Sequence, residues 1–171
     1  MEIIVLRLGH RLPRDERIST HVALVARAFG ANSIIYSGQH DSGLEASVKK
    51  ICENWGGLFH ISYERNPLTF IKKMKDTGFT VLHLTMYGIS LSDKLNALKL
   101  HKKLLIIVGS EQVPRDIYEF ADFNISITNQ PHSEVAALAI TLDRLNKGKK
   151  IDFRGKLSIK PSARGKVLEK K

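Results

Sequence analysis

The feature that most constrains the fold of this chain is a regular alternation of short, β-rich apolar runs with helix-like segments. Six strands are predicted, at Ile3–Leu8, Ser33–Ser37, Leu58–Tyr63, Thr80–Thr85, Leu104–Val108 and Asn124–Thr128. Helices are predicted between and after them, at Arg17–Phe29, Leu44–Trp55, Pro67–Thr77, Ser92–His101, Pro114–Phe120 and Ser133–Asn146. This order is typical of an α/β fold in which a mostly parallel sheet carries helices on both faces.

The positive charge is concentrated at one end of the chain. The net charge is +10, from 27 Lys and Arg against 17 Asp and Glu. Residues 148–171 hold nine basic and two acidic residues and so carry +7, which leaves +3 for residues 1–147. We therefore predict one globular domain over residues 1–147 and a basic tail over residues 148–171, to which no firm structure is assigned. Such a tail indicates contact with a polyanion, or it is a solvated segment that only aids solubility.

Several classes of protein are not expected. No apolar run approaches the roughly 18 residues that span a bilayer, and the first residues, MEIIVLRLGH, lack the pattern of a signal peptide. The single cysteine, Cys52, excludes an internal disulfide and fits a reducing compartment. The seven histidines are scattered without the spacing of metal ligands. We therefore expect a cytoplasmic protein with no membrane contact and no metal.

Three predicted strands end in segments that could border a ligand pocket, because ligands of open α/β sheets bind at the carboxyl ends of strands. These segments are Leu84–Gly88, Gly109–Val113 and Ile127–Glu134. The first two are equally ordinary as packing and as a strand–turn–helix connection. In the third, a capped helix start explains Ser133 and Glu134 but leaves the preceding polar cluster unexplained, which favours ligand binding.

A cluster of basic residues follows the first predicted strand. It contains Arg7, His10, Arg11, Arg14, Asp15, Arg17 and His21. Four arginines within eleven residues suit contacts with phosphate groups, and the alternative is a solvated helix start with local ion pairs. Arg27 lies within an apolar helix and is interpreted as structural. His83, inside an apolar run, is interpreted as a hydrogen-bonded core residue.

Three segments in order, LGHRLPRDERISTHVALVARAFGA, VGSEQVP and TNQPHSEVAALA, resemble the SPOUT class of RNA methyltransferases. The resemblance is closest to the archaeal tRNA (cytidine(56)-2'-O)-methyltransferase family. It implies a deep C-terminal trefoil knot, a homodimer, and S-adenosylmethionine held in the knot by three loops. The residues implied to bind this cofactor are Leu84, Thr85, Met86, Tyr87, Gly88, Gly109, Ser110, Glu111, Gln112, Val113, Ile127, Thr128, Asn129, Gln130, Pro131, His132, Ser133 and Glu134.

The resemblance further implies methyl transfer to the 2'-hydroxyl of cytidine 56 in the T-loop of tRNA. In related enzymes an arginine of the N-terminal motif assists this step, and here Arg17 is the first candidate, followed by Arg11 and Arg14. The chain departs from its bacterial relatives in having HSEVA where they have an SLNVS-like stretch. A non-catalytic RNA-binding protein on the same fold is the main alternative. A flavodoxin-type nucleotide-binding domain would leave the basic tail unexplained.

Overall fold

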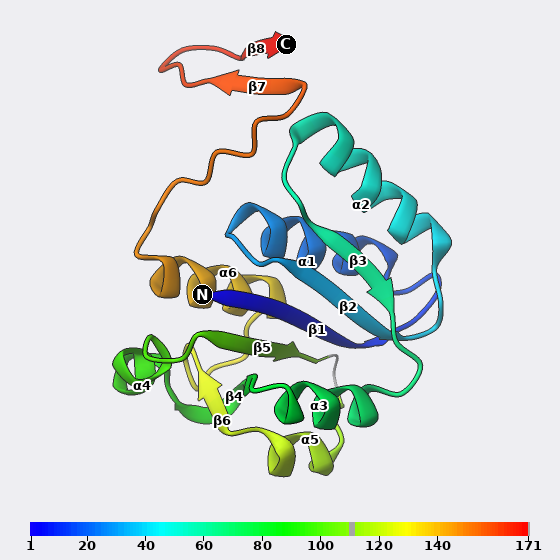
Figure 1. Ribbon diagram of the computed structural model, residues 1–171, viewed down its shortest axis with the longest axis vertical. Helices are drawn as coiled ribbons and strands as arrows, with labels where there is room; N and C mark the ends of the chain where they lie inside the picture. The colour runs from blue at the N-terminus through cyan, green and yellow to red at the C-terminus, as the bar shows by residue number, and fades with distance from the viewer. Residues whose placement is uncertain (110–111, 171) are drawn as a thin grey trace.

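The computed structural model describes residues 1–109 and 112–170, which form a layered α/β body and a small C-terminal hairpin (Figure 1). Six strands make the main sheet: β1 (Glu2–His10), β2 (Ser33–Gly38), β3 (His60–Tyr63), β4 (Thr80–Ser90), β5 (Lys103–Val108) and β6 (Phe123–Ser126). Six helices connect and follow them: α1 (Glu16–Ala28), α2 (Ser42–Trp55), α3 (Pro67–Asp76), α4 (Leu91–Leu98), α5 (Arg115–Phe120) and α6 (Glu134–Asn146). The predicted alternation is confirmed.

The main sheet has the strand order β3-β2-β1-β5-β4-β6, and all five neighbouring pairs are parallel. The chain runs outward from β1 through β2 to β3 and then crosses to the other half of the sheet. The strand order therefore reverses beside β1, whose neighbours are β2 and β5. A crevice at the carboxyl ends of strands is expected at such a reversal.

Two apolar cores lie on opposite faces of the sheet. Val5 and Ile106 belong to the core under α1, α2, α4 and α6, whereas their sequence neighbours Leu6 and Ile107 belong to the core under α3 and α5. Successive side chains of a strand point to opposite faces, so strands buried on both sides need continuous apolar runs. The expectation of helices on both faces is confirmed.

Local capping explains several element boundaries. The side chain of Asn66 accepts a hydrogen bond from the Thr69 amide, and Pro67 occupies the first turn of α3. The third strand begins later than predicted, at His60, where its pairing with β2 starts, and Leu58 before it is 92% exposed. The fourth continues past Thr85 to Ser90, with its pairing to β6 interrupted between Leu84 and Ile89.

The C-terminal segment has more structure than the sequence indicated. Strands β7 (Leu157–Lys160) and β8 (Val167–Lys170) pair as an antiparallel hairpin outside the main sheet, with β7 in contact with α2 (Figure 1). The segment leading to it is fastened to α1 and α2. The guanidinium of Arg27 lies 4.3 Å from the centre of the Phe153 ring and donates to the Gly56 carbonyl at 2.6 Å. Arg27 is buried and structural, as predicted.

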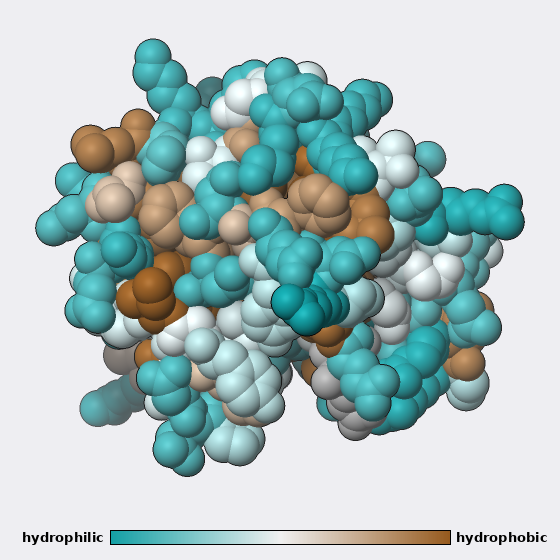
Figure 2. All heavy atoms as spheres, turned by 90° about the horizontal axis from the view of Figure 1, so that it is seen from below, coloured by the Kyte–Doolittle hydropathy of each residue, from teal (hydrophilic) through white to brown (hydrophobic). Residues whose placement is uncertain are grey.

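The surface is largely hydrophilic. On the face shown in Figure 2, apolar atoms appear only as separate patches among polar and charged side chains. None of the helices in the described part of the chain combines the length and apolar character needed to cross a membrane.

Candidate functional site

A cavity of about 390 Å³ opens between the carboxyl end of β1, the middle of β4, the end of β5 and the start of α6. Its size falls within the range of small-molecule sites. The described residues that line it are Arg7, Arg11, Arg14, Asp15, Ile18, His83, Leu84, Thr85, Met86, Tyr87, Val108, Gly109, Val113, Tyr118, His132, Glu134 and Ala137.

The structure brings many of the predicted cofactor residues to this cavity. They are Leu84, Thr85, Met86, Tyr87, Gly109, Val113, His132 and Glu134. Other predicted residues belong to the same segments without lining the cavity, namely Gly88, Gln112, Ile127, Thr128, Asn129, Gln130, Pro131 and Ser133. The predicted residues Ser110 and Glu111 lie outside the described residues.

Two residues that do not line the cavity hold its rim. The side-chain amide of Asn129 donates to the carbonyls of Met86, at 2.6 Å, and Gly88, at 3.3 Å. It thereby ties the segment before α6 to the segment within β4. Ser133 caps α6 by accepting from the Val135 amide at 3.1 Å. The polar cluster in this loop is therefore explained in part by loop-to-loop bonding.

The arginines that follow the first predicted strand line two different hollows in the structure. Arg7, Arg11 and Arg14 line the cavity, whereas Arg17 borders a different hollow. That hollow is formed with Glu16, Thr20, Asp41, Gly43, Leu44 and Ser47. Arg17 lies in the first turn of α1, on the side facing the start of α2, so the structure does not bring it to the cofactor segments. Arg11 and Arg14 lie in the loop before α1 and reach them.

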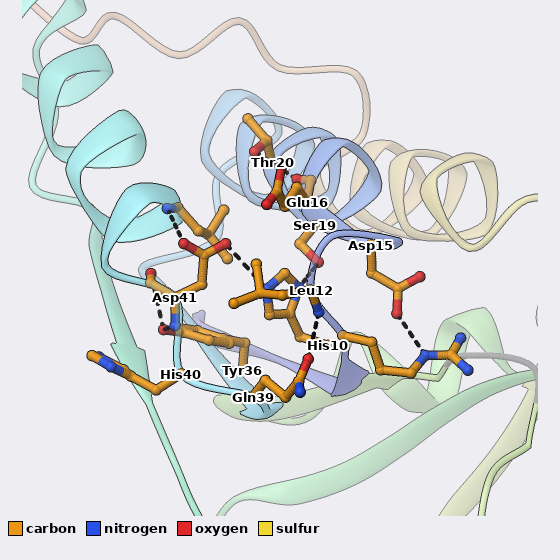
Figure 3. A network of polar contacts seen from close by, with 12 residues as sticks. His10, Leu12, Asp15, Glu16, Ser19, Thr20, Tyr36, Gln39, His40 and Asp41 are labelled. Carbon is orange, nitrogen blue, oxygen red and sulfur yellow. Dashed lines mark hydrogen bonds and ion pairs between the residues drawn. The ribbon is translucent and has the colours of Figure 1, made fainter.

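A buried polar network holds the loop that carries these arginines (Figure 3). His10 Nδ1 lies 2.7 Å from Ser19 Oγ, and its Nε2 lies 3.1 Å from Asp41 Oδ2. Asp41 also caps α2 by accepting from the Leu44 amide at 3.0 Å. The residue types are those of a hydrolase triad, but His10 and Ser19 are buried, so a substrate cannot reach the hydroxyl. The network therefore serves to position the loop.

The cavity also contains a buried ion pair. Arg7 Nη2 lies 3.2 Å from Glu134 Oε1, and the Arg7 side chain is 1% exposed. The other two nitrogens of the Arg7 guanidinium, Nε and Nη1, have no hydrogen-bond partner among the described residues. A buried donor without a partner is costly, so this arrangement is not the one that stability alone would favour.

Two carboxyl groups among the described residues of the cavity, those of Glu134 and Asp15, have pKa values shifted in opposite directions. Burial raises the pKa of Glu134, and although the Arg7 charge and hydrogen bond oppose this, the pKa stays above its usual value. Burial also raises the pKa of Asp15, but the hydrogen bond from Arg11 and the charges of Arg7, Arg11 and Arg14 lower it below its usual value. Asp15 is thus an ordinary ionised partner for Arg11, at 3.0 Å, whereas Glu134 holds its proton more readily.

His83 is a hydrogen-bonded core residue, as predicted, but it also borders the cavity. Its Nδ1 lies 2.9 Å from Asn124 Oδ1, and Asn124 Nδ2 donates to the Tyr118 carbonyl. In this arrangement Nδ1 carries the proton. Burial lowers the pKa of His83 and keeps the ring neutral.

Among the described residues, no group of three or more His, Cys, Asp or Glu side chains is arranged to hold a metal ion.

Comparison with known proteins then defines the family. Residues 55–169 match the model of the family described as tRNA ribose 2'-O-methyltransferase, aTrm56. The chain belongs to this family. A tRNA (cytidine(56)-2'-O)-methyltransferase of Pyrococcus horikoshii is 52% identical over 97% of this chain and 84% of its own length. The enzyme of that name from Methanocaldococcus jannaschii is 51% identical over 98% of this chain and 96% of its own length.

Solved structures support the fold of this aTrm56 family member. An AdoMet-bound rRNA methyltransferase from Sinorhizobium meliloti superposes with a TM-score of 0.64 at 22% identity, covering 85% of this chain and 56% of the other. At this identity the likeness establishes the shared α/β architecture. The deep knot remains a prediction from the resemblance.

Sequence reasoning missed several residues of the site in this aTrm56 family member. Ile18, His83, Val108, Tyr118 and Ala137 line the cavity without having been predicted as site residues, and Arg7 and Asp15 had been named only as members of the basic cluster. One signal was available: Arg7 is a charged residue inside the apolar run of β1, and charged side chains are rarely fully buried unless they are paired. Tyr118 carried no such signal, because it reaches the cavity through the packing of α5 against β4.

Proposed function

We propose that this protein transfers a methyl group from S-adenosylmethionine to the 2'-hydroxyl of cytidine 56 in the T-loop of tRNA, acting as a homodimer. The observation that carries the proposal is one cavity with two chemically different sides. One side is built from the segments after the sheet strands, and the other from Arg7, Arg11 and Arg14. The roughly 50% identity to enzymes of that name over nearly the whole chain supports the choice of reaction and nucleotide.

The residues of the cavity fit S-adenosylmethionine. Leu84, Met86, Val108 and Val113 provide apolar walls suited to a planar base, and the carboxyl groups of Asp15 and Glu134 suit a cationic sulfonium. When bound, this cofactor supplies an electrophilic methyl group. The rim bonds of Asn129 keep the two cofactor segments at a fixed separation, which limits the positions that a ligand can adopt.

Arg11 and Arg14 are proposed to bind the phosphate groups next to the target ribose. Arg11 is 42% exposed and uses its Nε to bond Asp15, so its terminal nitrogens point away from that bond. A guanidinium offers paired donors that match phosphate oxygens. The network of His10, Ser19 and Asp41 then has a functional meaning, because it fixes the loop that presents both arginines.

The hairpin β7–β8 and its flanking residues are proposed as a second RNA contact. This basic segment of residues 148–171 carries +7 on a body, residues 1–147, that carries only +3. Contacts between basic side chains and phosphates release counterions and supply affinity without sequence recognition. A tRNA substrate also agrees with the expected cytoplasmic location.

The test is to incubate the protein with labelled S-adenosylmethionine and an unmodified tRNA transcript. Label is expected at the ribose of nucleotide 56, and cofactor binding is expected by calorimetry without tRNA. A protein that binds tRNA but neither binds the cofactor nor transfers label is the non-catalytic RNA-binding protein, and the proposal is then wrong. Light scattering of the same sample tests the homodimer.

Arginine variants test the assignment of the phosphate contacts. Arg11→Ala and Arg14→Ala are each expected to lower kcat/KM for tRNA by about 10- to 100-fold, as the loss of one charge-assisted contact predicts. Cofactor affinity should remain nearly unchanged. Arg17→Ala is the matched control, since Arg17 lies outside the cavity and is expected to have a much smaller effect. If Arg17→Ala abolishes transfer while the other two do not, the assignment is reversed.

A further inference from the structure

Glu134 occupies an unusual position among the residues of the cavity. It is the first residue of α6 and directly follows the cap residue Ser133. Its carboxyl group forms an ion pair with Arg7 of β1, which is distant in the sequence. Its side chain is only 15% exposed, and the cavity is the space that it borders. A helix N-terminus and a guanidinium both favour the ionised form of a carboxyl group. The geometry therefore presents a desolvated carboxylate to whatever enters the cavity.

The carboxyl group of Asp15, which also lines the cavity, already forms an ion pair with Arg11. Asp15 accepts from Arg11 Nε at 3.0 Å, and its pKa is lowered by that bond and by neighbouring positive charge. A carboxylate with a lowered pKa accepts a proton poorly. Glu134, whose pKa burial raises, is the better acceptor of the two. Two carboxyl groups with opposite shifts in one site indicate which of them exchanges a proton.

We propose that Glu134 is the general base that removes the proton from the ribose 2'-hydroxyl. This inference rests on the proposed methyl transfer. The hydroxyl proton passes to a carboxylate oxygen of Glu134, and the electron pair on the ribose oxygen forms the new O–CH3 bond. The pair of the broken C–S bond stays on sulfur, which leaves a neutral thioether. Glu134 later returns the proton to solvent, so the enzyme is regenerated.

The surrounding groups are consistent with this role. Among the described residues, the other charged and titratable groups that line the same cavity come from five elements. They are Arg7 from β1, Arg11, Arg14 and Asp15 from the next loop, His83 and Tyr87 from β4, Tyr118 from α5 and His132 from the loop before α6. Arginine does not lose its proton in proteins, so the three guanidinium groups cannot act as the base. Asn124 engages His83 Nδ1, and the other ring nitrogen is buried without a described partner. The charge and hydrogen bond of Arg7 favour the ionised form of Glu134 and so oppose the effect of burial on its pKa.

The decisive variant is Glu134→Gln, which preserves the shape and the bond to Arg7 but cannot take a proton. The loss of a positioned base is expected to lower kcat by about 100-fold or more at saturating cofactor and tRNA. Because the Glu134 carboxyl also borders the proposed cofactor site, the affinity for S-adenosylmethionine by calorimetry is expected to fall by about threefold to tenfold. Measuring kcat at saturating cofactor and tRNA separates the proton-transfer step from that loss of binding. Glu119→Gln is the matched control, because Glu119 forms an exposed pair with Arg115 at 2.8 Å outside the cavity.

Two measurements on the unmodified protein keep the inference testable if Glu134→Gln does not fold. In carbon-13 NMR of the cofactor-free protein, one glutamate carboxyl is expected to titrate above the usual glutamate range. The single-turnover rate is expected to rise with pH through one ionisation and then level off. If Glu134→Gln does fold, both features should be missing from it.

Several results would overturn the inference. These are a kcat for Glu134→Gln close to that of the unmodified protein, a loss that weaker cofactor binding fully explains, a flat pH profile, or the absence of an up-shifted glutamate. A protein that neither binds S-adenosylmethionine nor methylates tRNA instead refutes the proposed function. A protein that methylates tRNA equally well with and without Glu134 refutes only the role of this base.

Discussion

The buried pair of Arg7 and Glu134 makes a prediction about stability that is independent of catalysis. Replacing Arg7 by Met keeps most of the side-chain volume but leaves the Glu134 carboxylate without its counter-charge. Removing one partner of a buried ion pair costs about 3–5 kcal/mol. Against this, Arg7→Met also removes two buried donors that have no described partner, a relief of about 1–3 kcal/mol. The net expectation at pH 8 is a loss of about 2 kcal/mol in the free energy of unfolding.

This loss has a characteristic pH dependence. Arg7 lowers the pKa of Glu134 in the folded protein, so its removal raises that pKa further above the unfolded value. A folded protein that binds more protons than the unfolded chain loses stability as the pH rises. Between the unfolded and the folded pKa of Glu134, the variant therefore becomes less stable with increasing pH. Below the raised pKa, Glu134 of the variant is protonated and neutral, so the deficit relative to the unmodified protein should shrink as the pH falls.

Thermal unfolding at pH 5 and pH 8 measures both effects. For a chain of this length, about 2 kcal/mol corresponds to a decrease in Tm of about 4–8 °C at pH 8. The double variant Arg7→Met with Glu134→Gln, which removes both charges, should recover the lost stability. Arg115→Met is the control, because exposed pairs contribute at most about 1 kcal/mol. An equal decrease in Tm at both pH values would refute the reasoning, since it would exclude an unpaired carboxylate as the cause.

Two further predictions concern the C-terminal segment. Phe153→Ala should lower the free energy of unfolding by about 1–2 kcal/mol, because the half-buried ring and its contact with Arg27 are lost. The same substitution should speed amide exchange in residues 157–170. Leu58→Ala, at an exposed position, is the control, and an equal change in that variant would contradict the role of the Phe153 contact. Replacing Lys160, Arg164 and Lys166 together by Gln should weaken tRNA binding and reduce the slope of log affinity against log salt by up to about 2–3, from about 0.7–0.9 per phosphate contact. An unchanged slope would show that the hairpin does not contact RNA.

The main sheet was predictable because burial on both faces leaves little freedom of composition. Strands such as β5, Lys103–Val108, need apolar residues at nearly every position, and those runs are visible in the sequence. The strand boundaries differ from the predicted ones where contacts between residues distant in sequence determine them. The irregular pairing of β4 with β6 carries β4 to Ser90, and no local pattern encodes this.

The C-terminal hairpin was not predictable for a related reason. Its strands are four residues long, and an isolated two-stranded hairpin is marginally stable in water. The segment is instead held by contacts distant in sequence. Phe153 packs on Arg27, and a Cβ atom added to Gly56 would lie 2.0 Å from the Phe153 carbonyl oxygen, so only glycine allows this approach.

The arginine cluster illustrates a limit of sequence patterns. The sequence places Arg11, Arg14 and Arg17 within one short segment and offers no means of deciding which faces a ligand. That decision depends on the loop conformation, which the bond between His10 and Asp41 fixes across 31 residues. The resemblance to the family made Arg17 the first candidate, whereas the packing of α1 turns Arg17 toward α2.

Arg7 and Glu134 are both charged residues at positions that are usually occupied differently, and the two side chains contact each other. In β1 the residues Ile3, Val5 and Arg7 point to the same face of the sheet, so a charge stands where an apolar side chain is expected. Glu134 begins a helix and is nevertheless mostly buried. Apolar replacements of such a pair are often neutral or stabilising, so stability does not account for its presence. Departures of this kind are expected where function requires them. Two such departures, separated by 127 residues, meet in the cavity that also collects the predicted cofactor segments, and this coincidence favours a chemical role for the pair.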